Sequence, residues 1–192
     1  NFNEFFVLRS LNKNISIKKN LTFPIIIKPN KGSGSRGVYL FKNLKKLSQF
    51  VSTYKFTKFN KLIIEKFIKG QEYSVEAMSF KNKIQIISIS RRIIHNFTTA
   101  SEIFTIDRNA NIAIQIEHTI IKFIEKTNIK NSLFHIELIV DKFKKINLID
   151  VSLRGGGYNV ADFLAFHNSS FNINKFFIYH FLNIKYLASI KK

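Results

Sequence analysis

The sequence predicts an α+β fold, and three observations lead to this class. β-branched runs bounded by turn residues predict strands at Phe23–Pro29 and Leu62–Phe67. Apolar residues at helical spacing predict an amphipathic helix over Ile112–Thr127. The strands come in hairpins beside helices and do not alternate regularly with them. This arrangement favours α+β layers over a doubly wound parallel sheet.

The first part of the chain is predicted to be mainly strand. Glu4–Leu8 is expected to form a strand at the start of the chain. The glycine-serine cluster of Lys31–Gly37 predicts a turn, after which Val38–Phe41 is again a strand. Asn43 is a suitable cap for a helix over Leu44–Tyr54, where apolar residues recur at helical spacing.

The second part is predicted to mix strands and helices. Tyr73–Phe80 and Ile84–Arg91 predict a hairpin, whereas Ala100–Asn111 has only a weak pattern and is expected to be a connection. The remaining expected elements are strands at Leu133–Val140 and Lys145–Asp150, a break at Gly155–Gly157, and helices at Val160–Phe166 and Ile173–Leu182.

Length and composition limit the class of protein. The 192 residues, 45% of them hydrophobic, suit one domain or two small lobes with a real core. The absence of cysteine excludes disulfides, thiolate metal sites and a cysteine nucleophile, and it agrees with a cytoplasmic protein. Charged residues interrupt every apolar run, so we expect no membrane partner. Because the chain begins at Asn1 inside an expected strand, we expect it to be a fragment.

The net charge of +19 has two interpretations. A basic surface for nucleic acid is one of them. However, the lysines are spread along the whole chain, which is also rich in Asn, Ile and Phe. These residues have A/T-rich codons, so genomic base bias is the favoured explanation and nucleic-acid binding the less favoured one.

The glycine-rich loop after Lys28 is the first candidate binding motif. The loop Lys31–Gly37 lies between two expected strands, which excludes a P-loop and a dinucleotide fingerprint because both need a helix after the glycines. Its backbone N–H groups and serine hydroxyls are suited to phosphate oxygens, and Lys28 would add a fixed cation. An ordinary hairpin turn is the alternative.

A second motif joins an apolar strand to an acidic turn. The segment Ile64–Ile68 could present backbone groups to a flat base, and Glu72 follows a turn, where its carboxylate could accept hydrogen bonds from ribose hydroxyls. A surface strand with solvated charges is the alternative, and for this motif alone it is the favoured one.

A third motif is a set of carboxylates on two expected strands. Glu137 shares a face with His135, and Asp150 and Ser152 lie on one side of the next strand. Two carboxylates and a neutral oxygen suit magnesium, and Arg154 could reach a γ-phosphate through its forked guanidinium. A solvent-facing hairpin edge is the alternative.

Other polar residues receive simpler interpretations. Arg91 and Arg92 end a strand and could bind a substrate carboxylate, but a solvated strand end is favoured. The histidines have no metal-ligand spacing. His135 is the best placed of them, and we expect it beside a metal ligand and not on the metal.

Taken in order, three segments resemble the ATP-grasp superfamily. They are FPIIIKPNKGSGSRGV (Phe23–Val38), LIIEKFIKGQEYSVE (Leu62–Glu76), and FHIELI with INLIDVSLRGGG (Phe134–Ile139 and Ile146–Gly157). Within the superfamily, the sequences of these motifs are most similar to those of the branch that contains amino-acid ligases and carbamoyl-phosphate-synthetase-like proteins. The resemblance implies one ATP-grasp domain over residues 1–192, with a lid lobe at about 20–68, a larger lobe carrying the metal strands at 69–192, and the nucleotide between them.

The resemblance also implies a role for each matching residue. Arg154 would be catalytic by stabilising the transferring phosphate. The phosphates of ATP would be bound by Lys28, Ser33, Gly34 and Ser35. The adenine would be bound by Glu65, Lys66, Phe67 and Ile68, with Ile139 and Ile149 on the faces of the base, and the ribose would be bound by Glu72. The metal ion, Mg²⁺ (or Mn²⁺), would be bound by Glu137, Asp150 and Ser152. Asp150 and Ser152 depart from the Glu and Asn usual in the family, which points to a shifted or weaker metal site.

The activity that the resemblance implies is an ATP-dependent carboxylate–amine (or thiol) ligation through an acyl phosphate, with release of ADP and phosphate. Its partners would be small-molecule carboxylates and amines, and a homo-oligomer is left open. A non-catalytic ATP-binding module is the alternative, because the metal set is unusual.

Overall fold

A computed structural model describes residues 5–8, 21–32, 34–54, 62–80, 83–95 and 99–157, together with the single positions Asn172, Lys175, Ile178 and Leu182. The chain divides into two compact units. Unit 1 contains residues 1–69 and 95–99, and unit 2 contains residues 70–94 and 100–192.

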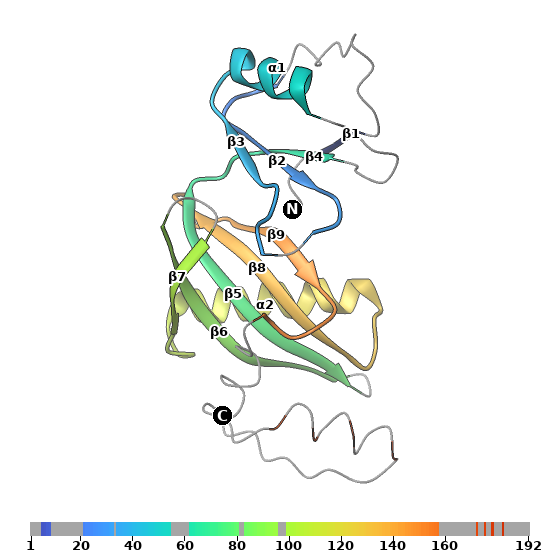
Figure 1. Cartoon of the computed structure of the whole chain (residues 1–192). Coiled ribbons are helices and arrows are strands. Elements are labelled where there is room, and N and C mark those ends of the chain that lie inside the picture. Colours follow the sequence, from blue (N-terminus) through green and yellow to red (C-terminus); the bar gives the residue numbers. More distant parts are fainter. Residues whose placement is uncertain are drawn as a thin grey trace. The chain divides into compact units, whose positions relative to one another are not determined.

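Unit 1 is built on a four-stranded sheet in the order β1-β4-β2-β3 (Figure 1). Its strand pairs are antiparallel. Buried residues alternate with half-buried ones along β2 and β4, so one face of this sheet is covered. The strands are β1 (Phe5–Leu8), β2 (Ile25–Pro29), β3 (Tyr39–Phe41) and β4 (Leu62–Lys66).

Helix α1 (Leu44–Thr53) supplies the remaining core of unit 1. Asn43 caps it as expected, because its side-chain oxygen accepts a hydrogen bond from the Lys46 N–H at 3.0 Å. Leu47 on the helix is buried with Ile25 and Ile27 of β2. Burial of this apolar stripe holds the helix on the sheet.

Unit 2 is built on a five-stranded sheet in the order β7-β6-β5-β8-β9. The pairs β5–β6, β5–β8 and β8–β9 are antiparallel. The strands are β5 (Gly70–Phe80), β6 (Lys83–His95), β7 (Thr99–Thr105), β8 (Ser132–Asp141) and β9 (Ile146–Ser152).

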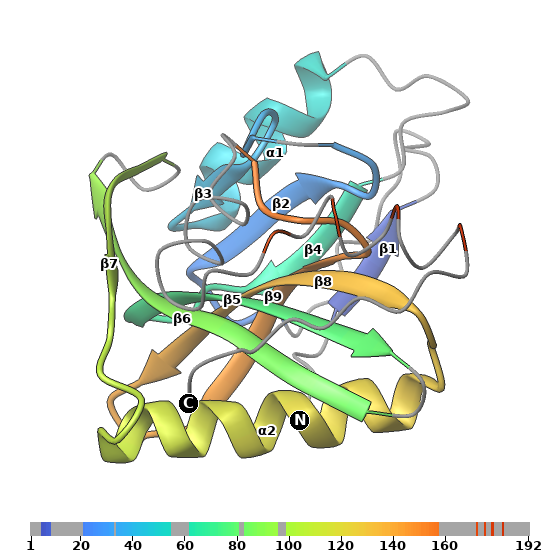
Figure 2. The ribbon, with the colours of Figure 1, turned by 90° about the horizontal axis from the view of Figure 1, so that it is seen from below.

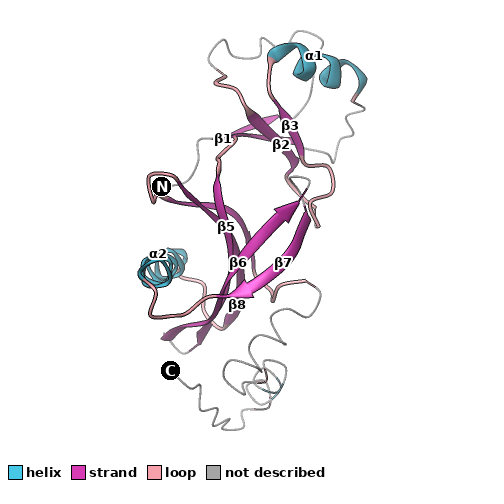
Figure 3. Cartoon of the chain, turned by 90° about the vertical axis from the view of Figure 1, so that its left-hand side faces the viewer, coloured by secondary structure: helices cyan, strands magenta, loops and turns pink. Residues whose placement is uncertain are grey.

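Helix α2 (Asn111–Thr127) lies along one face of this sheet, as Figures 2 and 3 show. Its buried isoleucines pack with apolar residues that alternate along β5 and β8. The predicted helix and its apolar face are confirmed. The buried helix residues are Ala113, Ile116, Ile120 and Ile124, and the strand residues include Val75, Ala77, Phe134, Ile136 and Leu138. Because strand side chains alternate, the intervening residues of these strands face away from α2.

The predicted α+β class is confirmed, and most elements lie where the sequence predicts them. One expectation was wrong: the connection expected over Ala100–Asn111 contains strand β7. The predicted helix Val160–Phe166 lies outside the described residues, as does most of Ile173–Leu182. Neither of the long described helices combines the length and apolar character needed to cross a bilayer.

Candidate functional site

The face of the five-stranded sheet that points away from α2 carries three rows of mainly polar residues. Directly paired residues of antiparallel strands lie on the same face, so the register defines each row. Taken from β6 through β5 and β8 to β9, the rows are Arg92, Glu72, Ile139 and Asn147; Ser90, Ser74, Glu137 and Asp150; and Ser88, Glu76, His135 and Ser152. The predicted face shared by Glu137 and His135 is thus part of a wider polar surface.

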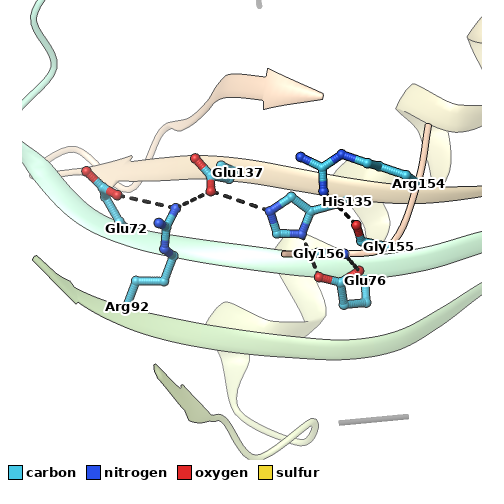
Figure 4. A network of polar contacts seen from close by, with 8 residues as sticks. All are labelled: Glu72, Glu76, Arg92, His135, Glu137, Arg154, Gly155 and Gly156. Atoms are coloured by element: carbon cyan, nitrogen blue, oxygen red, sulfur yellow. Dashed lines mark hydrogen bonds and ion pairs between the residues drawn. The ribbon is translucent and has the colours of Figure 1, made fainter. Parts of the chain in front are cut away.

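Five side chains on this face form a chain of alternating acidic and basic groups (Figure 4). Glu76 Oε1 lies 2.5 Å from His135 Nδ1, and His135 Nε2 lies 3.4 Å from Glu137 Oε1. On the other side of Glu137, Arg92 Nη1 lies 2.6 Å from the same Oε1 atom. Arg92 Nη1 also lies 3.8 Å from Glu72 Oε2. Each interior group therefore has a partner of opposite type on both sides.

This row of charged side chains shifts the pKa values of Glu137 and Glu72, the two carboxylates that flank Arg92. Burial alone would raise the pKa of Glu137, but the hydrogen bond from His135 and the charge of Arg92 bring it below its ordinary value. Burial raises the pKa of Glu72; the charge of Arg92 opposes this shift, and the charge of Glu137 adds to it. Glu137 is therefore the more firmly ionised of the two carboxylates.

His135 is the second cation beside Glu137. Burial by itself would lower its pKa, but hydrogen bonds with Glu137 and Glu76 and their negative charges raise the pKa to about 9. At neutral pH the ring is therefore protonated, and both ring nitrogens donate. It forms a positive link between two carboxylates.

The predicted metal residues lie on two neighbouring strands. Glu137 is paired with Asp150, and His135 is paired with Ser152. Within the described part of the chain, no three histidine or carboxylate side chains gather into a complete metal cage. Magnesium does not require one, since it often binds one or two carboxylates and completes its octahedron with water and phosphate oxygens. The donor set therefore fits a magnesium ion that is bound together with phosphates.

In unit 1, Lys28 and the glycine-rich loop are adjacent. Lys28 lies on β2, and its Nζ is 2.9 Å from Glu65 Oε1 of β4. The backbone of the loop turns tightly, with positive φ angles at Gly34, Ser35 and Gly37. Glycine adopts this conformation without strain. Ser33 lies outside the described residues.

The segment predicted to meet the base, Glu65 to Ile68, covers the end of β4 and the two residues after it. Lys66 is exposed and ends the strand, and Ile68 is half-buried. The Phe67 N–H donates to Pro24 O at 3.0 Å, so it is not a free donor for a base. In unit 2, Ile139 is largely buried beside Glu72, and Ile149 is the extra residue of a β-bulge next to the Glu137–Asp150 pair.

The loop after β9 brings Arg154 close to the polar face. The Arg154 side chain is exposed, and its Nη1 donates to Gly155 O at 2.7 Å. The next residue, Gly156, donates its backbone N–H to Glu76 Oε2 at 3.2 Å. A Cβ atom at Gly156 would lie only 2.5 Å from Glu76 Oε1, so the loop can pack here only with glycine.

Two members of this site, Arg92 and Glu76, were not predicted from the sequence. The expectation that Arg92 is solvated at a strand end was wrong, because the Arg92 side chain is only 13% exposed and contacts Glu137. Its neighbour Arg91 is exposed, as expected. Glu76 received no role, although it lies two and four residues beyond Ser74 and Glu72 on one strand face. That alternation was the signal available in the sequence.

Comparison with known sequences gives a match over most of the chain. A sequence model of the family described as ATP-grasp domain matches residues 21–162. A D-alanine–D-alanine ligase of Flavobacterium psychrophilum is 30% identical over 80 residues. That match covers 42% of this chain and 24% of the relative, so the chain matches only about a quarter of that enzyme.

Solved structures share the fold. An L-amino acid ligase from Bacillus licheniformis matches with a TM-score of 0.73 and 20% identity, over 90% of this chain and 41% of the other. A carboxyaminoimidazole ribonucleotide synthase from Aspergillus clavatus, complexed with ATP, matches with a TM-score of 0.78 and 14% identity. This match covers 100% of the present chain and 50% of the synthase. At these identities the similarity concerns the fold alone.

Proposed function

The chain belongs to the ATP-grasp domain family, and we propose that it binds Mg-ATP and takes part in an ATP-dependent carboxylate–amine (or thiol) ligation. The D-alanine–D-alanine ligase among its sequence relatives supports small carboxylates and amines as the substrate class. Because the chain matches only part of these proteins, the activity is proposed for the protein to which this domain belongs.

The observation that carries the proposal is the pairing of Glu137 with Asp150 on the polar sheet face. The two carboxylates, with the Ser152 hydroxyl one pair further along, would hold Mg²⁺ or Mn²⁺. The ion would neutralise charge on the phosphates of ATP. His135 and Arg92 keep Glu137 ionised, and a carboxylate must be ionised to bind a cation.

The roles that we propose for the other residues follow the order of the motifs. Lys28 binds the α- and β-phosphates, and the loop of Ser33, Gly34 and Ser35 covers the β- and γ-phosphates through N–H and hydroxyl donors. We further propose that adenine is bound at Glu65, Lys66, Phe67 and Ile68, that Ile139 and Ile149 contact its faces, and that Glu72 accepts hydrogen bonds from the ribose. The division into a lid lobe at about 20–68 and a larger lobe at 69–192, with the nucleotide between them, stays a prediction.

The proposed reaction has two steps. A carboxylate oxygen of the substrate attacks the γ-phosphorus in line, the bond to the β-phosphate oxygen breaks, and ADP leaves with the electron pair. The amine then attacks the acyl carbon of the acyl phosphate, phosphate leaves, and the nitrogen loses a proton. Arg154 would donate hydrogen bonds to the transferring phosphate, so the protein works by positioning and charge neutralisation.

A second candidate is a non-catalytic ATP-binding module. The observation in its favour is that Arg92 lies 2.6 Å from Glu137 Oε1 and so shares the carboxylate that would bind the metal. If this contact persists with nucleotide bound, only Oε2 would be left for the ion, and the metal would bind weakly. The two candidates predict the same nucleotide binding and different turnover.

The test is a coupled assay of ADP release with Mg²⁺ and a panel of amino and hydroxy acids paired with amines. Acid-dependent ADP release that disappears in Glu137→Gln is the result expected of the ligase. Nucleotide binding without acid-dependent release favours the non-catalytic module. A protein that binds no nucleotide contradicts both candidates.

The cytoplasmic location and the lack of a nucleic-acid partner remain predictions, and the oligomeric state stays open. Binding to nucleic acid whose affinity falls steeply with added salt would contradict the predicted lack of a nucleic-acid partner.

A further inference from the structure

Glu76 is a buried carboxylate to which the proposed reaction gives no role. Glu76 is 2% exposed to solvent, and it lies on β5 between Ser88 of β6 and His135 of β8. A buried charge is costly unless it is paired and hydrogen-bonded. Both of its oxygens have partners: Oε1 contacts His135 Nδ1 at 2.5 Å, and Oε2 accepts the Gly156 N–H at 3.2 Å.

The first of these contacts leads to the proposed metal ligand. The Glu76 contact at Nδ1 fixes the orientation of the imidazole ring, and the opposite nitrogen, Nε2, then lies 3.4 Å from Glu137 Oε1. A side chain that holds a metal ligand in place commonly affects metal affinity without touching the metal. Glu76 holds His135, and His135 in turn contacts Glu137, the proposed metal ligand.

The second contact leads to the loop that carries Arg154. The backbone of Gly156 packs directly on the acid–imidazole pair, since a Cβ atom there would lie 2.5 Å from Glu76 Oε1 and 3.0 Å from His135 Nδ1. The loop is thus fixed two residues after Arg154, whose guanidinium donates to the intervening Gly155 carbonyl at 2.7 Å. Figure 4 shows the carboxylate of Glu76 beside Gly156 and His135.

We propose that Glu76 is a positioning residue, which holds the metal ligand Glu137 through His135 and holds the Arg154 loop through the backbone of Gly156. This inference rests on the proposed function, because it takes Glu137 as the metal ligand. In this proposal Glu76 acts through His135 and Gly156 and not on the metal or the nucleotide, and each of its oxygens has a partner within the protein.

The test measures ADP affinity by calorimetry, with and without Mn²⁺, in the whole chain. Glu76→Gln keeps the shape of the side chain and removes its charge, and Gly156→Ala disturbs the same contact from the loop side. Both variants should reduce the strengthening of ADP binding by Mn²⁺ roughly 10–100-fold. Their ADP affinity without metal should change less than about twofold. The double variant should lose little more than Glu76→Gln alone, because Glu76→Gln already disturbs the contact with the Gly156 backbone that Gly156→Ala changes.

Ser79→Ala is the matched control for a purely structural effect. Ser79 is also buried on β5, and its hydroxyl donates to Ile129 O at 2.9 Å, away from the acidic and basic groups. The control should lower the melting temperature and leave the Mn²⁺ response intact. If Glu76→Gln behaves like this control, the positioning role is wrong. Should Glu76→Gln fail to fold, Gly156→Ala decides the matter by the same criterion.

The same measurement separates this inference from the proposed function. A wild-type chain whose ADP affinity does not respond to Mn²⁺ contradicts the proposed metal-nucleotide site, and the positioning role fails with it. A wild-type response that survives unchanged in Glu76→Gln and Gly156→Ala contradicts only the positioning role.

Discussion

Arg92 Nη1 lies 2.6 Å from Glu137 Oε1, so the proposed metal ligand is held by a cation from a strand that is not its neighbour in the sheet. Arg92 also lies 3.8 Å from Glu72 and is largely buried. It therefore separates two carboxylates that would otherwise repel each other across β5 and β8.

Replacement of Arg92 by an uncharged residue should destabilise unit 2. Arg92→Met should lower the free energy of unfolding by about 1.5–3 kcal/mol, since it removes a charge-assisted contact and leaves Glu137 and Glu72 without their shared counter-ion. Urea denaturation of metal-free protein measures the effect. Arg91→Met, at the exposed neighbouring position, should change stability by no more than about 0.5 kcal/mol. Equal effects of the two changes would contradict the ion-pair assignment.

His135 should titrate far above an ordinary histidine in the metal-free protein. Its pKa in the folded chain is raised from 6.5 to about 9 by Glu76 and Glu137. Because the folded pKa is the higher one, protonated His135 contributes stability that is fully present below pH 6.5 and is lost as the pH rises through about 9. NMR of the imidazole C–H signals measures this pKa, and Glu76→Gln should lower it. Titration near 6.5 in the wild-type protein would show that the two acids do not hold the ring.

Two glycines test the close approach of β5 to β8. A Cβ atom at Gly70 would lie 2.2 Å from the Val140 carbonyl oxygen, whereas one at Gly157 would have nothing within 4 Å. Gly70→Ala should therefore destabilise the protein by about 1–3 kcal/mol, because the backbone of β8 must move. Gly157→Ala should have an effect below about 0.5 kcal/mol. Thermal unfolding of the two variants provides the comparison, and a stable Gly70→Ala would contradict the strand packing described here.

Lys28 tests the proposed phosphate contact in unit 1. Lys28→Ala should weaken ATP binding by about 1.5–3 kcal/mol, which corresponds to a roughly 10–150-fold rise in Kd. Calorimetric titration with ATP gives this number. Lys45→Ala removes an exposed lysine of α1 and controls for the loss of net positive charge. Unchanged affinity in Lys28→Ala would remove Lys28 from the site.

The regular elements followed from the sequence because their apolar residues recur with the period of a helix or a strand. The buried Ile116, Ile120 and Ile124 identify α2 in this way. Strand β7 was missed because Ile103 and Phe104 are adjacent and both exposed, which leaves no alternation to detect. Strand β5 begins at Gly70, before the predicted Tyr73, because its pairing with β8 continues to Asp141.

The candidate site was predictable only where its residues belong to one strand or to a recognisable motif. The shared face of Glu137 and His135 follows from their spacing of two. The partners of Arg92 and Glu76 come from strands that are distant in the sequence, and no local pattern reveals that these charges meet. A charged residue at a strand end is ordinarily solvated, so the pairing of Arg92 required the tertiary structure.

Glu137 is proposed to bind a magnesium ion together with ATP. The most direct measurement is the ATP affinity of the wild-type chain and of Glu137→Gln, each with and without Mg²⁺. Mg²⁺ should strengthen ATP binding to the wild-type chain. In Glu137→Gln, whose metal-free affinity should be similar, the strengthening should be lost. Equal strengthening by Mg²⁺ in both proteins would show that Glu137 is not the metal ligand.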